Sequence, residues 1–179
     1  MSTVKDSMTH IQYQWVTVEV RNGIPFDFST IGASFIKQLP QIPAVYRWAV
    51  YEKNVLRKVY IGETEELKKR IYQYFKPGPS QSTNLRLNAT FKKDIAVGLS
   101  VRLEILQVVP TYLNNIYICN GNFSDQYIRE MMENFTLADS DVTQYKILYA
   151  TENPIERRKR KAMKGNTLEA FFQEHGLTD

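Results

Sequence analysis

Alternation between apolar and polar residues predicts four main strands. The stretch 11–20 reads IQYQWVTVEV, and a period of two with β-branched and aromatic residues is typical of a strand. The stretches 44–51 and 55–62 flank a turn at 52–54 and are expected to pair as a hairpin. The fourth strand is expected at 100–109. Shorter strands are expected at 116–119 and 143–150.

Spacing of three and four between apolar residues predicts the helices. One helix is expected from Thr64, a plausible N-cap, because Glu65 and Glu66 complement the positive end of its dipole. A second helix is expected to end at Gly98, a residue type common just past a helix end. A third is expected to begin near Ser124. The apolar faces expected for the three are Leu67, Ile71, Tyr74 and Phe75; Leu85, Leu87, Phe91 and Ile95; and Tyr127, Ile128, Met131, Met132 and Phe135. Further helices are expected from Ser29 and at 166–176.

The order of these elements predicts an α+β fold, with a small, mostly antiparallel central sheet flanked by helices. We expect three parts along the chain. Residues 1–43 form an N-terminal extension, with a strand or hairpin and a short helix, that packs on the core. Residues 44–150 form the core itself, and 151–179 form a basic C-terminal extension with a terminal helix.

Composition narrows the classes of function. The chain has 179 residues, one cysteine and two histidines, which argues against disulfides, multi-cysteine zinc sites and histidine-based catalysis. No apolar run approaches the roughly 20 residues of a membrane span. The first residues lack the apolar centre of a signal peptide, so a cytoplasmic location is expected. A net charge of +4 favours a polyanionic partner modestly.

Two short motifs resemble the signature of a nuclease family. The sequence Ala-Val-Tyr ends at Tyr46, and Tyr-Ile-Gly starts at Tyr60. Arg70 follows ten residues after Tyr60, and Tyr74 lies one helical turn further on. This arrangement resembles the GIY-YIG nuclease superfamily, in particular the nuclease domain of the bacterial excision-repair incision protein and the GIY-YIG restriction endonucleases. Residues 44–135 carry the resemblance, with Ala44 in place of the first glycine of the signature.

The resemblance implies a Mg²⁺-dependent (or Mn²⁺-dependent) endonuclease that cuts double-stranded DNA by direct water attack. Tyr46 and Tyr60 would position or deprotonate the water, and Arg70 would hold the phosphate charge. Tyr74 would support Arg70 or contact DNA. Glu130, on the helix near Ser124 and five residues after Asp125, would bind the metal. Each residue also has an ordinary interpretation, as a strand aromatic, a solvated charge or a surface glutamate.

Two positions of the family pattern, the metal-binding glutamate and a later asparagine, can be matched to more than one residue of this chain. Glu133 is a weaker metal candidate than Glu130, because helical rotation turns it away from the predicted apolar face. The family also has an asparagine after its glutamate helix. Asn134 lies too early and Asn153 too late for a clean match.

DNA contacts are expected from two segments that follow the helix of Arg70. The loop and helix start at 76–88 offer polar side chains near a helix N-terminus, and 156–164 forms a cluster of positive charge that suits non-specific phosphate binding. The candidate DNA-binding residues are Lys69, Lys76, Ser80, Thr83, Asn84, Arg86, Asn88, Arg157, Arg158, Lys159 and Arg160.

Within that family, a stand-alone chain of this length with both ends extended resembles a site-specific, restriction-type nuclease more than a part of the repair machinery. For a restriction nuclease, a two-fold DNA site would call for a homodimer. The alternatives are a structure-selective repair or recombination nuclease and a DNA-binding module of the same fold without catalysis. A structural or protein-interaction domain is a further alternative.

Overall fold

The structure is a computed structural model that describes residues 11–20, 23–29, 33–109, 111–113, 116–119, 123–141 and 146–147. The chain divides into two compact units, Met1–Leu148 and Tyr149–Asp179. All described residues belong to the first unit. The predicted terminal helix and the basic cluster at 156–164 lie outside the described residues.

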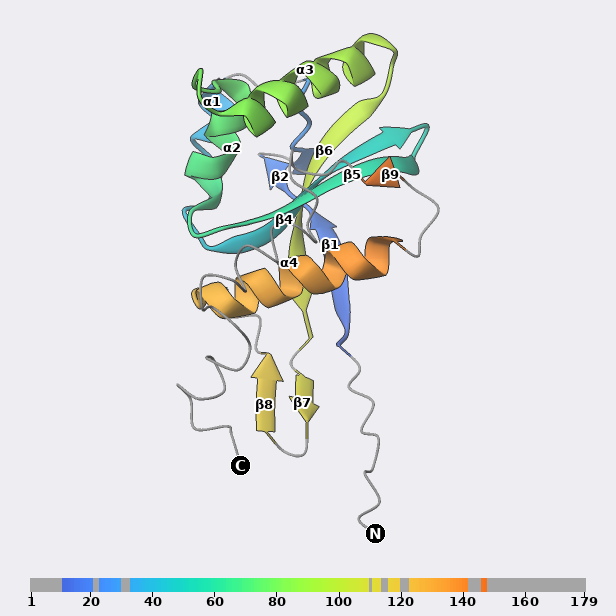
Figure 1. The fold of residues 1–179 in the computed structure, drawn as a ribbon. Helices are drawn as coiled ribbons and strands as arrows, with labels where there is room; N and C mark the ends of the chain where they lie inside the picture. Colours follow the sequence, from blue (N-terminus) through green and yellow to red (C-terminus); the bar gives the residue numbers. More distant parts are fainter. Residues whose placement is uncertain are drawn as a thin grey trace. The chain divides into compact units, whose positions relative to one another are not determined.

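A five-stranded sheet with the strand order β1-β6-β4-β5-β9 forms the centre of the first unit (Figure 1). Its neighbouring strands are antiparallel from β1 to β5, and β9 runs parallel to β5. The predicted α+β class and mostly antiparallel sheet are therefore confirmed. The strands are β1 (Tyr13–Thr17), β4 (Ala44–Glu52), β5 (Val55–Thr64), β6 (Ser100–Val108) and β9 (Lys146–Ile147).

Two short hairpins accompany the main sheet. Strands β2 (Glu19–Val20) and β3 (Ile24–Pro25) pair with each other, and Gly23 between them has a φ of +69°. Strands β7 (Thr111–Leu113) and β8 (Ile116–Cys119) form the other pair, so the predicted strand at 116–119 is confirmed.

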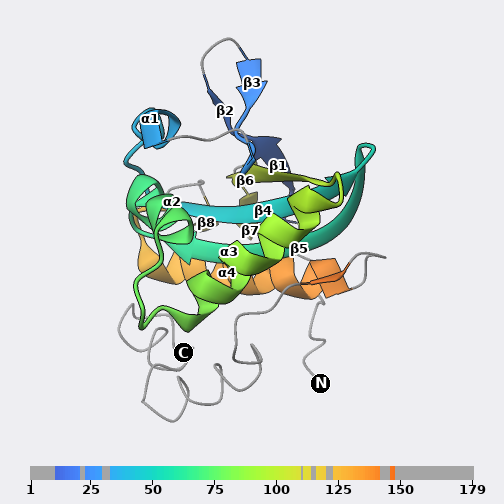
Figure 2. The ribbon, with the colours of Figure 1, turned by 90° about the horizontal axis from the view of Figure 1, so that it is seen from above.

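The helices lie on both faces of the sheet. Helices α2 (Leu67–Phe75) and α3 (Ser82–Ala96) cover one face, and α4 (Gln126–Asp141) covers the other (Figures 1 and 2). A short helix, α1 (Ala33–Ile36), precedes β4. Among the described residues, no helix combines the length and apolar character that a membrane span requires.

Side chains alternate along β4 and supply both faces with a core. Trp48, which is fully buried, points toward α2 and α3, where it contacts Tyr74 and Phe91. Val45 points the other way and packs with Met132 of α4. Because strand residues alternate in this way, consecutive positions in β4 and β5 serve opposite faces.

A tight turn sets the register of β4 against β5. Lys53 and Asn54 both have positive φ angles, 47° and 67°, as the two central residues of a type I′ turn require. The predicted hairpin is confirmed, with a turn one residue shorter than expected. A register shift between Val50 and Tyr51 follows directly.

The expected N-cap of α2 is wrong. Thr64 ends β5, and the helix begins at Leu67 after Glu66, which makes no side-chain capping bond. The N–H of Leu67 instead donates to the backbone oxygen of Ile42 at 2.9 Å. The chain before β4 therefore supplies the acceptor that a capping side chain would otherwise provide.

The expected apolar face of α4 is largely wrong. Tyr127, Met131 and Phe135 are 45%, 36% and 37% exposed, while the buried positions include Arg129 and Glu133. Arg129 can be buried because Glu63 of β5 accepts a hydrogen bond from its Nε at 2.9 Å. On the side of α4 that faces the sheet, this ion pair therefore lies beside the apolar contacts of Met132.

Candidate active site

Strands β4 and β5 bring the two motif tyrosines to one face of the sheet. Tyr46 pairs with Gly62, and Trp48 pairs with Tyr60, so these four residues point toward the face covered by α2. Helix α2 then places Arg70 and Tyr74 over the tyrosines. We call Tyr46, Tyr60, Arg70 and Tyr74 the Tyr–Arg cluster.

The hydroxyl of Tyr46 is the centre of this cluster. It lies 2.8 Å from the hydroxyl of Tyr74 and accepts a hydrogen bond from Nε of Arg70 at 2.9 Å. Both tyrosines are fully buried. Three predicted site residues, from β4 and from two turns of α2, therefore share one hydrogen-bond network.

Gly62 makes room for that hydroxyl. A Cβ atom at position 62 would lie 2.8 Å from the Tyr46 hydroxyl oxygen and 3.0 Å from its Cζ. Real Cβ atoms essentially never approach other atoms this closely. Glycine in the Tyr-Ile-Gly motif is thus explained by close approach of a side chain.

Arg70 is held on three sides. In addition to the bond to Tyr46, its Nη1 donates to Oε1 of Gln73 at 3.1 Å, and its Cζ lies 4.8 Å from the centre of the Tyr74 ring. A guanidinium has five N–H groups, so three of them have no acceptor among the described residues. Those three can bind an anion without disturbing the contacts that fix the side chain.

Burial controls the protonation of the cluster. Desolvation raises the pKa of Tyr46 well above its ordinary value, and nearby Tyr60 raises it further. Desolvation also raises the pKa of Tyr74. For Arg70, desolvation alone would lower the pKa, but the oxygens of Tyr46, Tyr74 and Tyr60 outweigh it and raise the pKa overall. At neutral pH, Tyr46 and Tyr74 are therefore protonated phenols beside a permanent cation, and Tyr46 is not suited to act as a base.

Tyr60 differs from the other two tyrosines. Its ring packs edge-on against Tyr74 with centroids 6.0 Å apart, and the residue is 5% exposed. Its hydroxyl makes no hydrogen bond to another described residue, whereas those of Tyr46 and Tyr74 bond to each other. Of the three phenols, Tyr60 is the one with a hydroxyl available to a water molecule or a substrate.

Glu130 belongs to the helix that covers the opposite face of the sheet. It lies on α4, and its Oε1 accepts a hydrogen bond from Nε2 of Gln126 at 3.1 Å. The neighbouring Arg129 bonds to Glu63, the residue directly after Gly62, so the N-terminal half of α4 lies at the same end of β5 as the Tyr–Arg cluster. The predicted convergence of Glu130 with Arg70 on one phosphate stays a prediction.

Glu133 was expected to point away from the apolar face of its helix and so into solvent, and the structure corrects this. The residue is 8% exposed and lies one turn after Arg129 on the buried side of the helix. A buried carboxylate requires compensation by hydrogen bonds or positive charge. Glu133 has interactions of its own within the protein, so Glu130 stays the first candidate for the metal-binding role and Glu133 the weaker alternative.

Among the described residues, no group of three or more His, Cys, Asp or Glu side chains could hold a metal ion. Mg²⁺ is commonly bound through only one or two carboxylates, together with water and substrate phosphate. A single glutamate of α4 is chemically sufficient for that kind of site.

The predicted DNA-binding residues separate into exposed and buried groups. Lys69, Lys76 and Ser80 are exposed, and Thr83 and Arg86 are partly buried. Asn84 and Asn88 are 3% and 9% exposed, and Asn88 donates to the backbone oxygen of Tyr74 at 2.6 Å. The burial of these two asparagines indicates a structural role in place of the expected DNA contact. Arg157, Arg158, Lys159, Arg160 and Asn153 lie outside the described residues.

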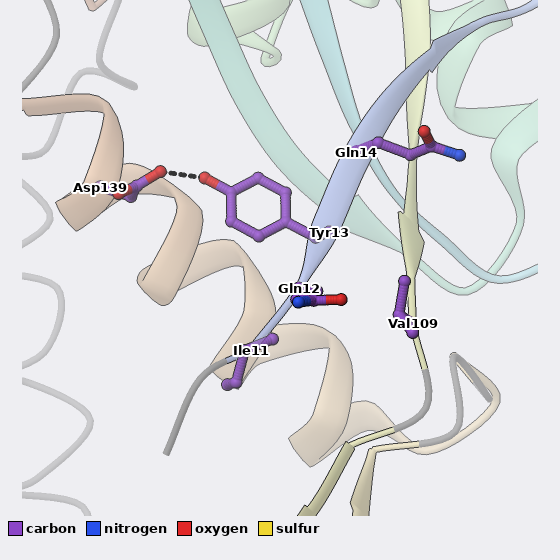
Figure 3. Close-up of a pocket in the computed structure, with 6 residues that line it drawn as sticks. All are labelled: Ile11, Gln12, Tyr13, Gln14, Val109 and Asp139. Carbon is purple, nitrogen blue, oxygen red and sulfur yellow. Dashed lines mark hydrogen bonds between the residues drawn. The ribbon is translucent and has the colours of Figure 1, made fainter. Parts of the chain in front are cut away.

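A separate hollow of about 650 Å³ lies beside β1 (Figure 3). Tyr13 donates a hydrogen bond to Asp139 of α4 at its wall. Strands β6 and β4 separate β1 from β5, so this hollow is distinct from the Tyr–Arg cluster. Its lining residues are Ile11, Gln12, Tyr13, Gln14, Val109 and Asp139.

Sequence reasoning missed Gln73 and Arg129. Gln73 carries no motif signal, although a polar residue three positions after Arg70 lies within reach on a helix. Arg129 was missed because the sequence pattern predicted the wrong buried face for its helix.

No family model matches the chain, and no curated protein or solved structure matches it significantly.

Proposed function

We propose that this protein is a Mg²⁺-dependent endonuclease that hydrolyses phosphodiester bonds of double-stranded DNA. The observation that carries the proposal is the position of Arg70, fixed by the Tyr46 hydroxyl and Gln73 with three N–H groups available. A guanidinium fork held in this way suits phosphate oxygens better than a lysine would.

Hydrolysis requires a water molecule in line with the leaving oxygen and stabilisation of the charge that develops on phosphorus oxygens. Arg70 would hold a non-bridging oxygen as negative charge grows. The Tyr60 hydroxyl would accept or donate a hydrogen bond to the attacking water and so orient it. Tyr46 and Tyr74 would keep Arg70 in place, because their hydroxyls bond within the cluster. Water would add to phosphorus as the bond to the leaving oxygen breaks, with no covalent enzyme intermediate. The oxygen of the water would stay on the phosphate, one of its protons would pass to solvent, and the leaving oxygen would take up a proton from solvent.

Glu130 would hold Mg²⁺ through its carboxylate, and Glu133 is the alternative ligand. The ion supplies Lewis acidity toward a phosphate oxygen and lowers the pKa of bound water. This role requires that the chosen glutamate and Arg70 reach one phosphate. A separation too large for that, in a complex with DNA, would refute this part of the proposal.

A plasmid-nicking assay with Mg²⁺ or EDTA tests the activity. We expect nicking in the presence of Mg²⁺ and none in EDTA. We expect Arg70→Ala to reduce nicking by on the order of 100- to 1,000-fold, the loss seen in other enzymes when one oxyanion donor is removed. Arg57→Ala is the matched control, because Arg57 forms an exposed ion pair with Glu52. Cutting that persists in EDTA, or that Arg70→Ala leaves unchanged, would contradict the proposal.

Substitution of the two glutamates separates the candidate metal ligands. Glu130→Gln or Glu133→Gln, whichever removes the ligand, is expected to raise the Mg²⁺ concentration needed for half-maximal nicking. If both variants need the same Mg²⁺ concentration for half-maximal nicking as the wild type, both residues are excluded from the metal site.

A DNA-binding module without catalysis is the second candidate. It is favoured by the internal bonding of the Tyr46 and Tyr74 hydroxyls, which leaves one phenol of three available. Salt-dependent DNA binding by wild-type protein with no nicking at any Mg²⁺ or Mn²⁺ concentration would support it. A site-specific, homodimeric restriction role is the finer form of the nuclease proposal, and discrete plasmid fragments would support it.

A further inference from the structure

Gln73 lies one turn after Arg70 on α2 and is partly buried. Its Oε1 accepts a hydrogen bond from Nη1 of Arg70 at 3.1 Å. Tyr46 occupies Nε of the same guanidinium, so Gln73 provides the second polar contact that fixes the plane of the group.

The orientation of the Gln73 amide follows from its partner. A guanidinium only donates hydrogen bonds, so the amide oxygen must face Arg70. The amide nitrogen therefore faces away from Nη1, and it has no hydrogen-bond acceptor among the described residues. Gln73 thus carries two N–H donors beside the three that Arg70 leaves available.

We propose that Gln73 and Arg70 together form a phosphate clamp for the DNA backbone. The amide oxygen of Gln73 holds the guanidinium, and its Nε2 donates to the phosphate that Arg70 binds. This inference rests on the proposed function and deepens it, since it assigns a binding residue that no motif indicates.

The neutral amide is essential to this arrangement. A glutamate at position 73 would also hold the guanidinium, but it would neutralise Arg70 and repel the phosphate. A methionine would have nearly the same shape and neither effect. The pair Gln73→Glu and Gln73→Met therefore separates charge from packing.

Equilibrium binding of a short labelled DNA duplex in EDTA, over a series of salt concentrations, tests the clamp. We expect Gln73→Glu to weaken binding roughly ten- to a hundredfold, the range for hydrogen bonds to charged groups. We also expect it to lower the slope of log K against log salt by about one, as loss of one phosphate contact does. Gln73→Met should weaken binding less and leave the slope nearly unchanged.

A double variant tests whether the effect passes through Arg70. In the Arg70→Ala background, Gln73→Glu should weaken binding by a smaller factor than in wild type, because no guanidinium remains to be neutralised. Gln107→Glu is the charge control, since Gln107 is exposed on β6 and contacts Gln14. Thermal unfolding of each variant establishes that it is folded.

The outcomes distinguish this inference from the proposed function. If Gln73→Glu binds DNA with the affinity and salt slope of wild type, or weakens binding equally in both backgrounds, the clamp is overturned while nuclease activity still stands. If wild type binds DNA but never nicks it, hydrolysis is overturned and the clamp stands on the binding data. If wild type does not bind DNA, both are overturned.

Discussion

Gly62→Ala is the substitution that probes the centre of the Tyr–Arg cluster most directly. The new methyl group would lie 2.8 Å from the hydroxyl oxygen of Tyr46, where ordinary contact begins at 3.4 Å, so about 0.6 Å of movement is required. Tyr46 is fully buried and its hydroxyl lies 2.8 Å from that of Tyr74 and 2.9 Å from Nε of Arg70. A shift of this size is enough to break one of these bonds or to misdirect Arg70.

The expected loss of stability has two parts. Overpacking a buried site costs about 1–3 kcal/mol. Weakening one or two hydrogen bonds adds about 0.5–1.5 kcal/mol each. We therefore expect Gly62→Ala to lower the free energy of unfolding by about 1.5–6 kcal/mol, measured by urea denaturation, and to reduce nicking strongly.

Gly98→Ala is the matched control, because a Cβ there meets nothing within 4 Å and the residue has a φ of +87°. It should cost about 1–2 kcal/mol through backbone strain alone and leave nicking unchanged. Adding Tyr46→Phe to Gly62→Ala should recover part of the stability, because the phenyl ring lacks the crowded oxygen. Strict additivity of the two changes, or a Gly62→Ala protein as stable and active as wild type, would refute this account.

Three further predictions concern charges and hydroxyls of the sheet. Glu63→Gln should lower the free energy of unfolding, measured by urea denaturation, by about 2–3 kcal/mol. This is less than the loss from breaking a fully buried ion pair, because Arg129 keeps two backbone acceptors. An unchanged urea midpoint would mean that the ion pair does not fix α4. Burial and Glu104 raise the pKa of Tyr51 to about 12, so its contribution to stability is present below pH 10 and is lost as pH rises through 12. Between pH 9 and 12, the free energy of unfolding should therefore fall less steeply with rising pH for Tyr51→Phe than for wild type. The same pH dependence in both proteins would contradict the assignment. Tyr60→Phe should reduce nicking by roughly 100-fold or more without a change in melting temperature, because that hydroxyl bonds to no described residue; full activity of the variant would remove Tyr60 from the mechanism.

The hairpin could be predicted from local signals, whereas the grouping of Tyr46, Tyr60, Arg70 and Tyr74 was expected only from the resemblance to the nuclease signature. Apolar and polar residues alternate in the stretches 44–51 and 55–62 on either side of a turn, and the helical spacing of Leu67, Ile71 and Tyr74 indicates the side of α2 that is buried. These patterns involve only residues close together in sequence, so they can be interpreted without knowledge of the tertiary contacts.

The face of α4 could not be predicted in the same way. Hydrophobic spacing selected Tyr127, Met131 and Phe135, but the buried side is organised around Arg129 and a glutamate of β5, 66 residues earlier in the chain. An ion pair over that separation leaves no periodic trace in the sequence. The burial of Asn88 was missed for a similar reason, since its acceptor is a backbone oxygen.

The register shift between Val50 and Tyr51 has a consequence for how the hairpin can vary in length. Beyond the shift, Tyr60 and Gly62 point to one face and Glu63 to the other, with no further irregularity in the pairing. Inserting or deleting one residue between the shift and Gly62 would move every later side chain of the strand to the opposite face of the sheet. Inserting or deleting two residues would return them to their original faces. Natural variants of this chain should therefore differ in length at the Lys53–Asn54 turn, where extra residues leave the phenols facing α2.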